Sequence, residues 1–255
     1  MIRPMISIWL VAKREILSFF VSPIAYVVLL VWLLFSGISF YYLAVALSSQ
    51  SMGASATTTP LRLFFGGSML FYLPLFVFAP ILTMRLVAEE KSSGTLEPLL
   101  TVPLTETSLV LGKYLAAMCC WCTLWAPTLV YVWIARGVGE GAVDMGAIGA
   151  TYLGILCIGL FYMSTGLLMS AVSRNQIVAA TLTFLVLAGL FLLGLGGYVF
   201  TSDEARGIFE YVGMWTQMDA FSKGIVDSRY LVYDLSLAVL GIFLSVRAIQ
   251  ANRWQ

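Results

Sequence analysis

The sequence contains no histidine at any of its 255 positions. This absence excludes imidazole as a general base, as a metal ligand and as an axial ligand of haem. The sequence also lacks the Gly-x-x-x-x-Gly-Lys-Ser/Thr run that binds nucleotide phosphates, and it has no His-Glu-x-x-His motif. We therefore predict no catalytic residue, no enzymatic activity and no cofactor bound by this chain.

Charged residues are scarce as well, at 11% of the sequence, whereas 60% of the residues are hydrophobic. A soluble domain carries about 25% charged residues, so this chain cannot cover a water-facing surface. Its apolar runs are about 20 residues long, which suits a helix that crosses the bilayer better than a strand of a barrel. We expect an integral membrane protein, and the net charge of +1 gives no reason to expect nucleic acid as a partner.

The four cysteines, Cys119, Cys120, Cys122 and Cys157, all lie inside apolar runs. Small residues that pack between membrane helices are the favoured interpretation. A soft-metal site built on the first three is the alternative, but charged thiolates in hydrocarbon would be costly. No metal site is predicted.

The fold class predicted from the pattern is an all-α integral membrane protein with one transmembrane domain over residues 1–255. Pro74 and Pro80 lie inside the second predicted span and invite a kink there. A cleaved signal peptide ending near Ala44-Val45-Ala46 is disfavoured, because the apolar run starts too late and is too long. The six predicted spans cover about 24–47, 64–88, 108–135, 145–172, 177–200 and 230–249.

Residues 1–23 mix apolar and polar side chains and end at a break, Ser22-Pro23. This pattern predicts an amphipathic helix that lies in the membrane interface, with Trp9 at headgroup depth. The residues that would mark this helix are Trp9, Lys13, Arg14, Phe19 and Phe20.

Six spans would place both termini on one side of the membrane. Lysine and arginine are more frequent on this side, which also carries the insert 89–107, than on the other side with the segment 201–229. Positive loops stay in the cytoplasm, so we predict cytoplasmic termini and a short amphipathic external segment.

Almost every charged residue falls in a connection or at the end of a predicted span. A self-powered carrier usually needs ionisable groups within its spans to hold the coupling ion, so this distribution disfavours one. Any energy for work is expected to come from another protein.

The insert after the second span is the most polar connection in the chain. Ser93 or Thr95 could cap a short helix, and Leu96, Leu99 and Leu100 would form a stripe on it. That stripe would be a docking face for a soluble partner. An ordinary loop held at the membrane surface by its leucines is the alternative interpretation.

Two runs in the sequence resemble a known family. The first is Arg85-Leu86-Val87-Ala88-Glu89-Glu90-Lys91-Ser92-Ser93-Gly94-Thr95-Leu96-Glu97, followed by Leu99-Leu100-Thr101-x-Pro103 and Leu109-x-Leu111-Gly112-Lys113. The second is Phe221-Ser222-Lys223-Gly224-Ile225-Val226-Asp227. Both resemble the ABC type-2 exporter permeases, most closely the gliding-motility and nitrous-oxide-reductase-maturation permeases.

The resemblance implies a permease that pairs with an identical or homologous second subunit above two cytosolic ABC ATPase subunits, which hold ATP and Mg. The interfacial helix would be a second contact with the ATPase. The external segment, marked by Trp215, Phe221, Gly224 and Asp227, would close the outer end. The implied ATPase-coupling residues are Glu89, Glu90, Lys91, Ser93, Gly94, Thr95, Leu96, Glu97, Leu99 and Leu100.

The expected function is thus the membrane subunit of an ATP-driven exporter in the bacterial inner membrane. The alternative is a mechanical or scaffolding subunit that transmits the ATPase stroke to a periplasmic partner without moving a solute. A stand-alone carrier is the least favoured hypothesis.

Overall fold

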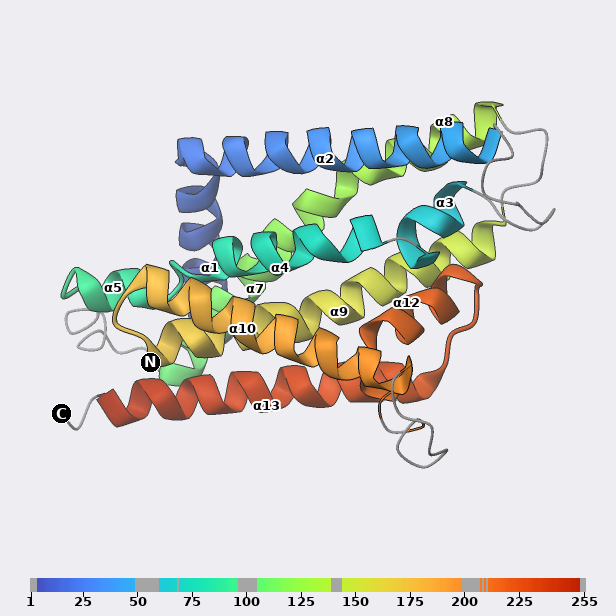
Figure 1. The fold of residues 1–255 in the computed structure, drawn as a ribbon. Coiled ribbons are helices and arrows are strands. Elements are labelled where there is room, and N and C mark those ends of the chain that lie inside the picture. The colour runs from blue at the N-terminus through green and yellow to red at the C-terminus, as the bar shows by residue number, and fades with distance from the viewer. Residues whose placement is uncertain are drawn as a thin grey trace.

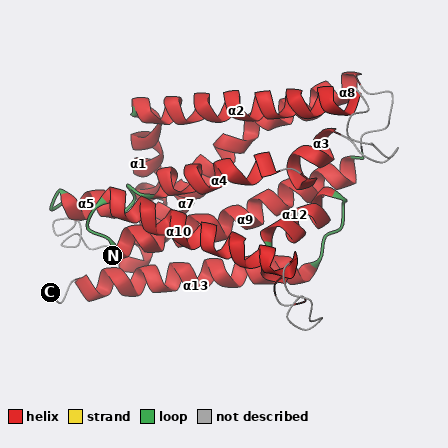
Figure 2. Ribbon diagram, in the orientation of Figure 1, coloured by secondary structure: helices red, strands yellow, loops and turns green. Residues whose placement is uncertain are grey.

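The computed structural model describes residues 4–48, 60–67, 69–95, 105–138, 144–198, 207, 209 and 211–252. Every regular element within these ranges is a helix, as Figures 1 and 2 show. The prediction of an all-helical chain is therefore confirmed for the described part.

The chain begins with two helices that meet at a corner. Helix α1 covers Pro4–Val21 and α2 covers Pro23–Ser48, and α1 stands across the direction of α2 in Figure 1. The corner is Ser22, whose N–H bonds the carbonyl of Phe19 at 3.1 Å. Proline has no N–H to continue a helix and is well tolerated at the first position of the next one, which explains the break.

The predicted span 64–88 consists of several pieces instead of one helix. Helix α3 (Pro60–Arg62) precedes the predicted span, which is made of the π-helix η1 (Leu63–Gly67), α4 (Met69–Thr83), a turn over 84–87 and the start of α5 (Ala88–Ser92). The hydroxyl of Ser170, on a distant helix, bonds the backbone of this turn. Hydropathy along the chain does not show such a bond, so the apolar pattern predicted one continuous helix through the turn.

The next segment is also broken where proline occurs. Helix α7 (Glu106–Trp125) leads into the 3-10 turn η2 (Ala126–Thr128), which contains Pro127, and then into α8 (Leu129–Val138). Thr105 caps α7, because its side chain accepts from the N–H of Ser108 at 3.2 Å.

The remaining helices are long, apart from one. They are α9 (Met145–Val172), α10 (Gln176–Gly194) with the 3-10 turn η3 (Leu195–Tyr198), the short α12 (Met214–Ser222) and α13 (Ser228–Asn252). Side chains start the first two: Asp144 accepts from the N–H of Gly146, and Asn175 from that of Ile177, each at 2.8 Å.

Five helical segments in the described residues are long and apolar enough to cross a membrane. Within the predicted second span only a shorter apolar helix, Pro74–Thr83, is found among these residues. The count of six crossings therefore stays a prediction. The five segments are Pro23–Ala46, Glu106–Gly137, Met145–Val172, Gln176–Gly194 and Ser228–Ala251.

The long helices run along one common direction, with α9 in the middle of the bundle (Figure 1). Helix α9 contacts α4, α7, α10, α12 and α13. Both ends of the drawn chain and α5 lie at one end of the bundle, and α12 lies at the other. We call these two ends the α5 end and the α12 end.

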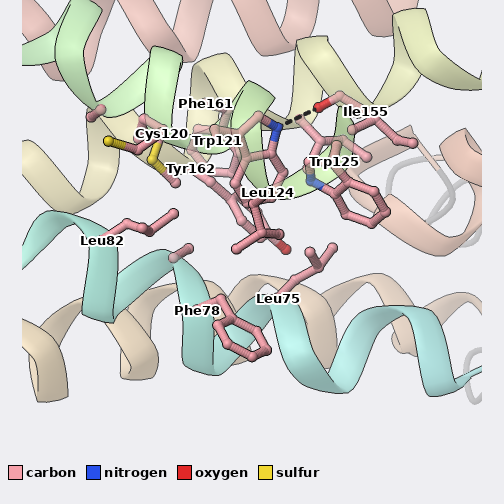
Figure 3. Close-up of a cluster of buried hydrophobic side chains, with 14 of the residues drawn as sticks. Leu75, Phe78, Leu82, Cys120, Trp121, Leu124, Trp125, Ile155, Phe161 and Tyr162 are labelled. Carbon is pink, nitrogen blue, oxygen red and sulfur yellow. Dashed lines mark hydrogen bonds between the residues drawn. The ribbon is translucent and has the colours of Figure 1, made fainter. Parts of the chain in front are cut away.

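Large aromatic side chains fill the core between α4, α7 and α9 (Figure 3). Trp121 is fully buried, and its indole N–H donates to the carbonyl of Ile155 at 3.1 Å. Gly159 faces this ring so closely that a Cβ placed there would lie 2.2 Å from Trp121 Nε1. The pairing of a glycine with a tryptophan sets the distance between α7 and α9.

Replacing Gly159 with alanine should therefore destabilise the protein, because Trp121 must move and its hydrogen bond is strained. Overpacking of this kind costs about 1–3 kcal/mol. Gly149→Ala on the same helix is the matched control, since nothing lies within 4 Å of its added Cβ. Thermal denaturation in detergent should show a lower midpoint for Gly159→Ala alone, and equal midpoints would contradict this account of the core.

Candidate functional site

A single hydroxyl from α9 holds the turn that leads into α5. Ser170 Oγ accepts the N–H groups of Val87 and Ala88 at 3.0 Å each and donates to the carbonyl of Met84 at 3.0 Å. The first N–H groups of a helix have no partner within it, and Ser170 supplies one from another helix. Helix α5 is thereby bound to α9 at its start.

The other end of α5 closes on itself around Gly94. Gly94 has φ +68°. The N–H of Thr95 donates to the carbonyl of Glu90 at 3.0 Å, and the N–H of Gly94 donates to the carbonyl of Lys91 at 3.3 Å. These two backbone hydrogen bonds form a Schellman motif, which requires a left-handed conformation at the glycine position. Gly94 therefore ends α5 and redirects the chain.

Ser93 and Thr95 were predicted to cap a helix that follows them. In the structure their hydroxyls bond each other at 2.9 Å, and Ser93 also donates to the carbonyl of Glu89 at 2.8 Å. Both side chains thus belong to the end of α5. The remaining predicted coupling residues, Leu96, Glu97, Leu99 and Leu100, lie outside the described residues.

Lys91 joins α5 to the last turn of α9, where its ammonium donates to the carbonyl of Ala171. A cation is favourable at the carboxyl end of a helix, whose last carbonyls have no partner within the helix. Partial burial, with the charge of Arg174 as a smaller cause, lowers the pKa of Lys91.

A four-charge network connects α5 with α1 and α7. Lys113 is only 1% exposed, and its ammonium lies 3.0 Å from Glu15 Oε1 and 2.9 Å from Glu90 Oε1. Arg14 bonds the same two oxygens, at 2.7 and 2.9 Å. Two cations and two carboxylates from three helices therefore share one cluster.

The fit between α1 and α7 brings Lys113 to this position. Its neighbour Gly112 packs against α1 so tightly that a Cβ there would lie 2.7 Å from Val11 Cβ and 2.9 Å from the carbonyl of Ile8. Lys113 also donates to the carbonyl of Leu86 in the turn before α5. The close backbone approach and the buried ammonium together dock α1 onto α7.

The surroundings of Glu15 determine its charge state. Burial alone would raise its pKa, but the charge of Lys113 and the hydrogen bonds from Arg14 and Lys113 outweigh burial and lower the pKa below the ordinary value. Glu15 is thus held as the anion at neutral pH.

A cleft of about 80 Å³ opens beside this network. Its charged rim includes the pair Arg85 and Glu89, whose atoms Nε and Oε2 lie 2.8 Å apart, and this pairing lowers the pKa of Glu89. Phe19 and Val28 line its apolar part, among other residues of α1, α2, α4 and α7.

The predicted residues of the first helix separate into two groups. Arg14 belongs to the ion network and Phe19 to the cleft, where its ring meets that of Phe20 edge-on at 5.6 Å. Trp9 is 62% exposed, and Lys13 is exposed. An exposed tryptophan and lysine on α1 are typical of a helix at a membrane interface.

The four predicted residues of the external segment lie at the α12 end, far along α9 from the charge network (Figure 1). Phe221 is buried against Gly154, and Trp215 stacks on Tyr72 with ring centroids 5.1 Å apart. Gly224, at φ +81°, ends α12 in a second Schellman motif.

Asp227 starts the next helix at this corner. Its carboxylate accepts the N–H of Arg229 at 2.9 Å, which caps α13. The run Phe221–Asp227 therefore forms a corner between two helices. Phe221 packs against α9, Gly224 ends α12 and Asp227 starts α13.

Glu15, Lys113 and Ser170 complete the site at the α5 end, although the sequence did not single them out as functional. Lys113 stood in the recognised run, but its partners are 98 and 23 positions away in the chain. Such distances leave no local pattern. Only the packing of α1 on α7 reveals the pairs.

Asp234 is an exception to the expectation that almost every charged side chain lies in a connection or at a span end. This residue lies within the candidate crossing segment of α13 and is 1% exposed. Hydropathy along the chain does not show which face of a helix a residue occupies, so its burial against neighbouring helices was missed.

Comparison with known proteins places most of the chain in a family. A model of the ABC-2 family transporter proteins matches residues 9–207. Two curated relatives, each described as probable multidrug ABC transporter permease YbhS, come from Escherichia coli K12 and O157:H7. Each is 33% identical over 175 residues, which cover 62% of this chain and 38% of the relative.

Removal of the Lys113 charge should destabilise the docking of α1. Lys113→Met keeps the length of the side chain but leaves Glu15 and Glu90 with Arg14 alone. Loss of one partner from a buried pair costs about 3–5 kcal/mol, and the partial exposure of the glutamates places the expected loss at the lower end. The matched control is Lys13→Met, which removes an exposed charge from α1.

Thermal denaturation should separate these two lysine variants, and hydrogen exchange should show faster opening of residues 4–21 in Lys113→Met only. Equal behaviour of the two variants would show that the buried network does not hold α1.

Acidification should loosen the same contact. Because the pKa of Glu15 is lower in the folded state than in the unfolded chain, its contribution is present above the unfolded value of about 4.3 and is lost as pH falls through the folded one. Glu15→Gln should therefore flatten the fall in thermal stability on acidification. An unchanged acid profile in this variant would rule out Glu15 as its source.

Proposed function

Since the chain belongs to the ABC-2 family of transporter proteins, we propose that it is the membrane-spanning permease subunit of an ATP-driven ABC exporter. This subunit is not catalytic: a separate cytosolic ATPase dimer holds ATP and Mg and supplies the energy. The chain spans 38% of the length of the curated relatives it matches, and the name of those relatives, a probable multidrug permease, agrees with an exporter.

One observation carries this proposal: α5 is tied to three other helices. Ser170 and the Ala171 carbonyl bind it to α9, and Glu90 binds it to α1 and α7. A force applied to the residues that follow α5 is therefore passed to the bundle. A loop that merely rested on the membrane surface would not need such ties.

The proposed stroke starts when ATP closes the ATPase dimer. The segment over 94–100 moves with the ATPase, and α5 moves with that segment because Gly94 ends α5 in a closed turn. Helix α9 contacts α5 near one end and α12 farther along, so the displacement reaches the α12 end. Helix α12 would act there as the outer closure.

Two permease subunits, identical or homologous, are proposed to form the pathway. The cytoplasmic placement of both termini follows from the lysine and arginine bias, and it is consistent with their position at the α5 end. The bacterial inner membrane is the proposed location. The resemblance to gliding-motility and nitrous-oxide-reductase-maturation permeases remains part of the proposal, and a periplasmic partner is its further consequence.

A second candidate function is purely mechanical. Phe221 buried against Gly154 fixes α12 to α9, so a stroke could reach an extracytoplasmic partner without opening a passage. Reconstitution with the ATPase distinguishes the two: ATP-dependent movement of a solute supports export. ATP hydrolysis that alters binding of a periplasmic protein, with no solute movement, supports the mechanical role.

The proposal predicts that aspartate at Leu96, Leu99 and Leu100 abolishes attachment of the ATPase, because an apolar docking stripe becomes anionic. The matched control replaces the same three residues with methionine, which keeps them apolar. Co-purification from detergent should recover the ATPase with the control and lose it by at least about tenfold, or about 1.4 kcal/mol, with the aspartate variant. Equal recovery of ATPase, with ATP-driven activity intact, would overturn the docking role.

A further inference from the structure

Asp234 is an acidic side chain inside the bundle that no basic side chain neutralises within the described residues. It lies on α13, is 1% exposed, and neither carboxyl oxygen has a hydrogen-bond partner within the described part of the chain. The ion pairs among these residues do not include it either. An ionisable group in a transmembrane helix is costly, and it usually marks a functional site.

The packing of α13 on α9 shows where this carboxyl lies. Gly241 of α13 packs against Ser164 of α9 so closely that a Cβ added to this glycine would lie only 2.9 Å from Ser164 Oγ. The two helices run in the same direction in Figure 1, so seven residues earlier Asp234 is level with Cys157. This level lies toward the α12 end, about 9 Å along the axis from the start of α13.

A second polar group without a partner occupies the same level of α9. Helix α12 packs against α9 with Phe221 at Gly154, and Met214 accepts a hydrogen bond from Tyr162. Gln217 lies between these two contacts, is 1% exposed, and its Oε1 has no partner in the described part. Buried acceptor oxygens without donors thus come from α12 and α13 to one stretch of α9.

Elementary electrostatics decides the state of such a carboxyl. A lone carboxylate in a medium of low dielectric is so unfavourable that the group takes up a proton instead. Neutral carboxylic acid has one O–H donor, which an ionised carboxylate lacks. A proton is therefore the ligand that this site requires.

We propose that Asp234 is a proton-binding site, held as the neutral acid while α9, α12 and α13 are closely packed. When the α12 end opens to water, the O–H bond breaks, the proton passes to water and the electron pair stays on the carboxylate. Proton binding and closure of the α12 end are thereby linked. This inference concerns the chain alone and does not depend on ATP-driven export.

Other titratable groups near Asp234 must be separated from it. Cys157 and Tyr162 of α9, and Tyr233 beside it on α13, are the nearby titratable groups that a charge on Asp234 would affect. Helix α10 carries no titratable side chain. Asp219 of α12 forms an exposed pair with Lys223, which directly follows this helix. The titratable side chains of α7 are Glu106, Lys113, Tyr114, Cys119, Cys120 and Cys122.

Infrared spectroscopy of the full chain in lipid nanodiscs tests the protonation directly. At neutral pH the carbonyl band of a neutral carboxylic acid should be present in the wild type and absent in Asp234→Asn. Asp219→Asn is the matched control, and its exposed carboxylate should contribute no such band. If the wild type and Asp234→Asn share the same neutral-acid spectrum, Asp234 is ionised and the proposal fails.

The link to closure is tested by thermal denaturation between about pH 5 and pH 8, because a carboxyl that is neutral only in the closed form changes the balance at pH values above the ordinary aspartate value of about 3.9. Release of one proton on opening shifts the balance toward the open form by at most about tenfold per pH unit. The midpoint of the wild type should fall across this range, and Asp234→Asn should lose most of that fall. Cys157→Ala should keep it, because the thiol is not the source.

Both variants are informative even if their absolute stabilities differ, since the slope with pH is compared and not the midpoint itself. A slope in Asp234→Asn equal to that of the wild type would overturn the link. A slope lost in Cys157→Ala would assign the titration to the thiol instead.

Discussion

A charged side chain that leaves water needs opposite charges around it, and this requirement organises the α5 end of the molecule. Lys113 is almost completely buried, and the carboxylates that neutralise it come from Glu15 on α1 and Glu90 on α5. Breaking a buried pair costs far more than breaking an exposed one. The positions of α1, α5 and α7 are therefore not independent, because each contributes a charge that the others need.

Local chemistry explains which parts of the fold the sequence could predict. Long apolar runs indicated the helices, and Ser22-Pro23 indicated the first corner. The α5 end was different. Its bonds join residues far apart in the chain, such as Ser170 with Val87, and a pattern of neighbouring residues cannot reveal them. The same limitation hid the burial of Asp234, since hydropathy averages over all faces of a helix.

The runs that resemble the ABC type-2 permeases acquire a physical meaning in the structure. Gly94 and Gly224 both have positive φ and both end a short helix with the same pair of backbone hydrogen bonds. Only glycine adopts this conformation without strain, so the two positions fix where α5 and α12 stop. One short helix lies at each end of the bundle, and each is anchored on α9 by buried contacts.

The length of α9 has a consequence for the membrane around it. Its 28 residues extend about 42 Å, roughly 12 Å more than the hydrocarbon thickness of a typical bilayer. A helix with this mismatch either tilts or lets its ends emerge among the lipid headgroups. Thin and thick bilayers therefore impose different inclinations on α9. Because this helix carries anchors for both short end helices, lipid composition sets their relative height across the bilayer.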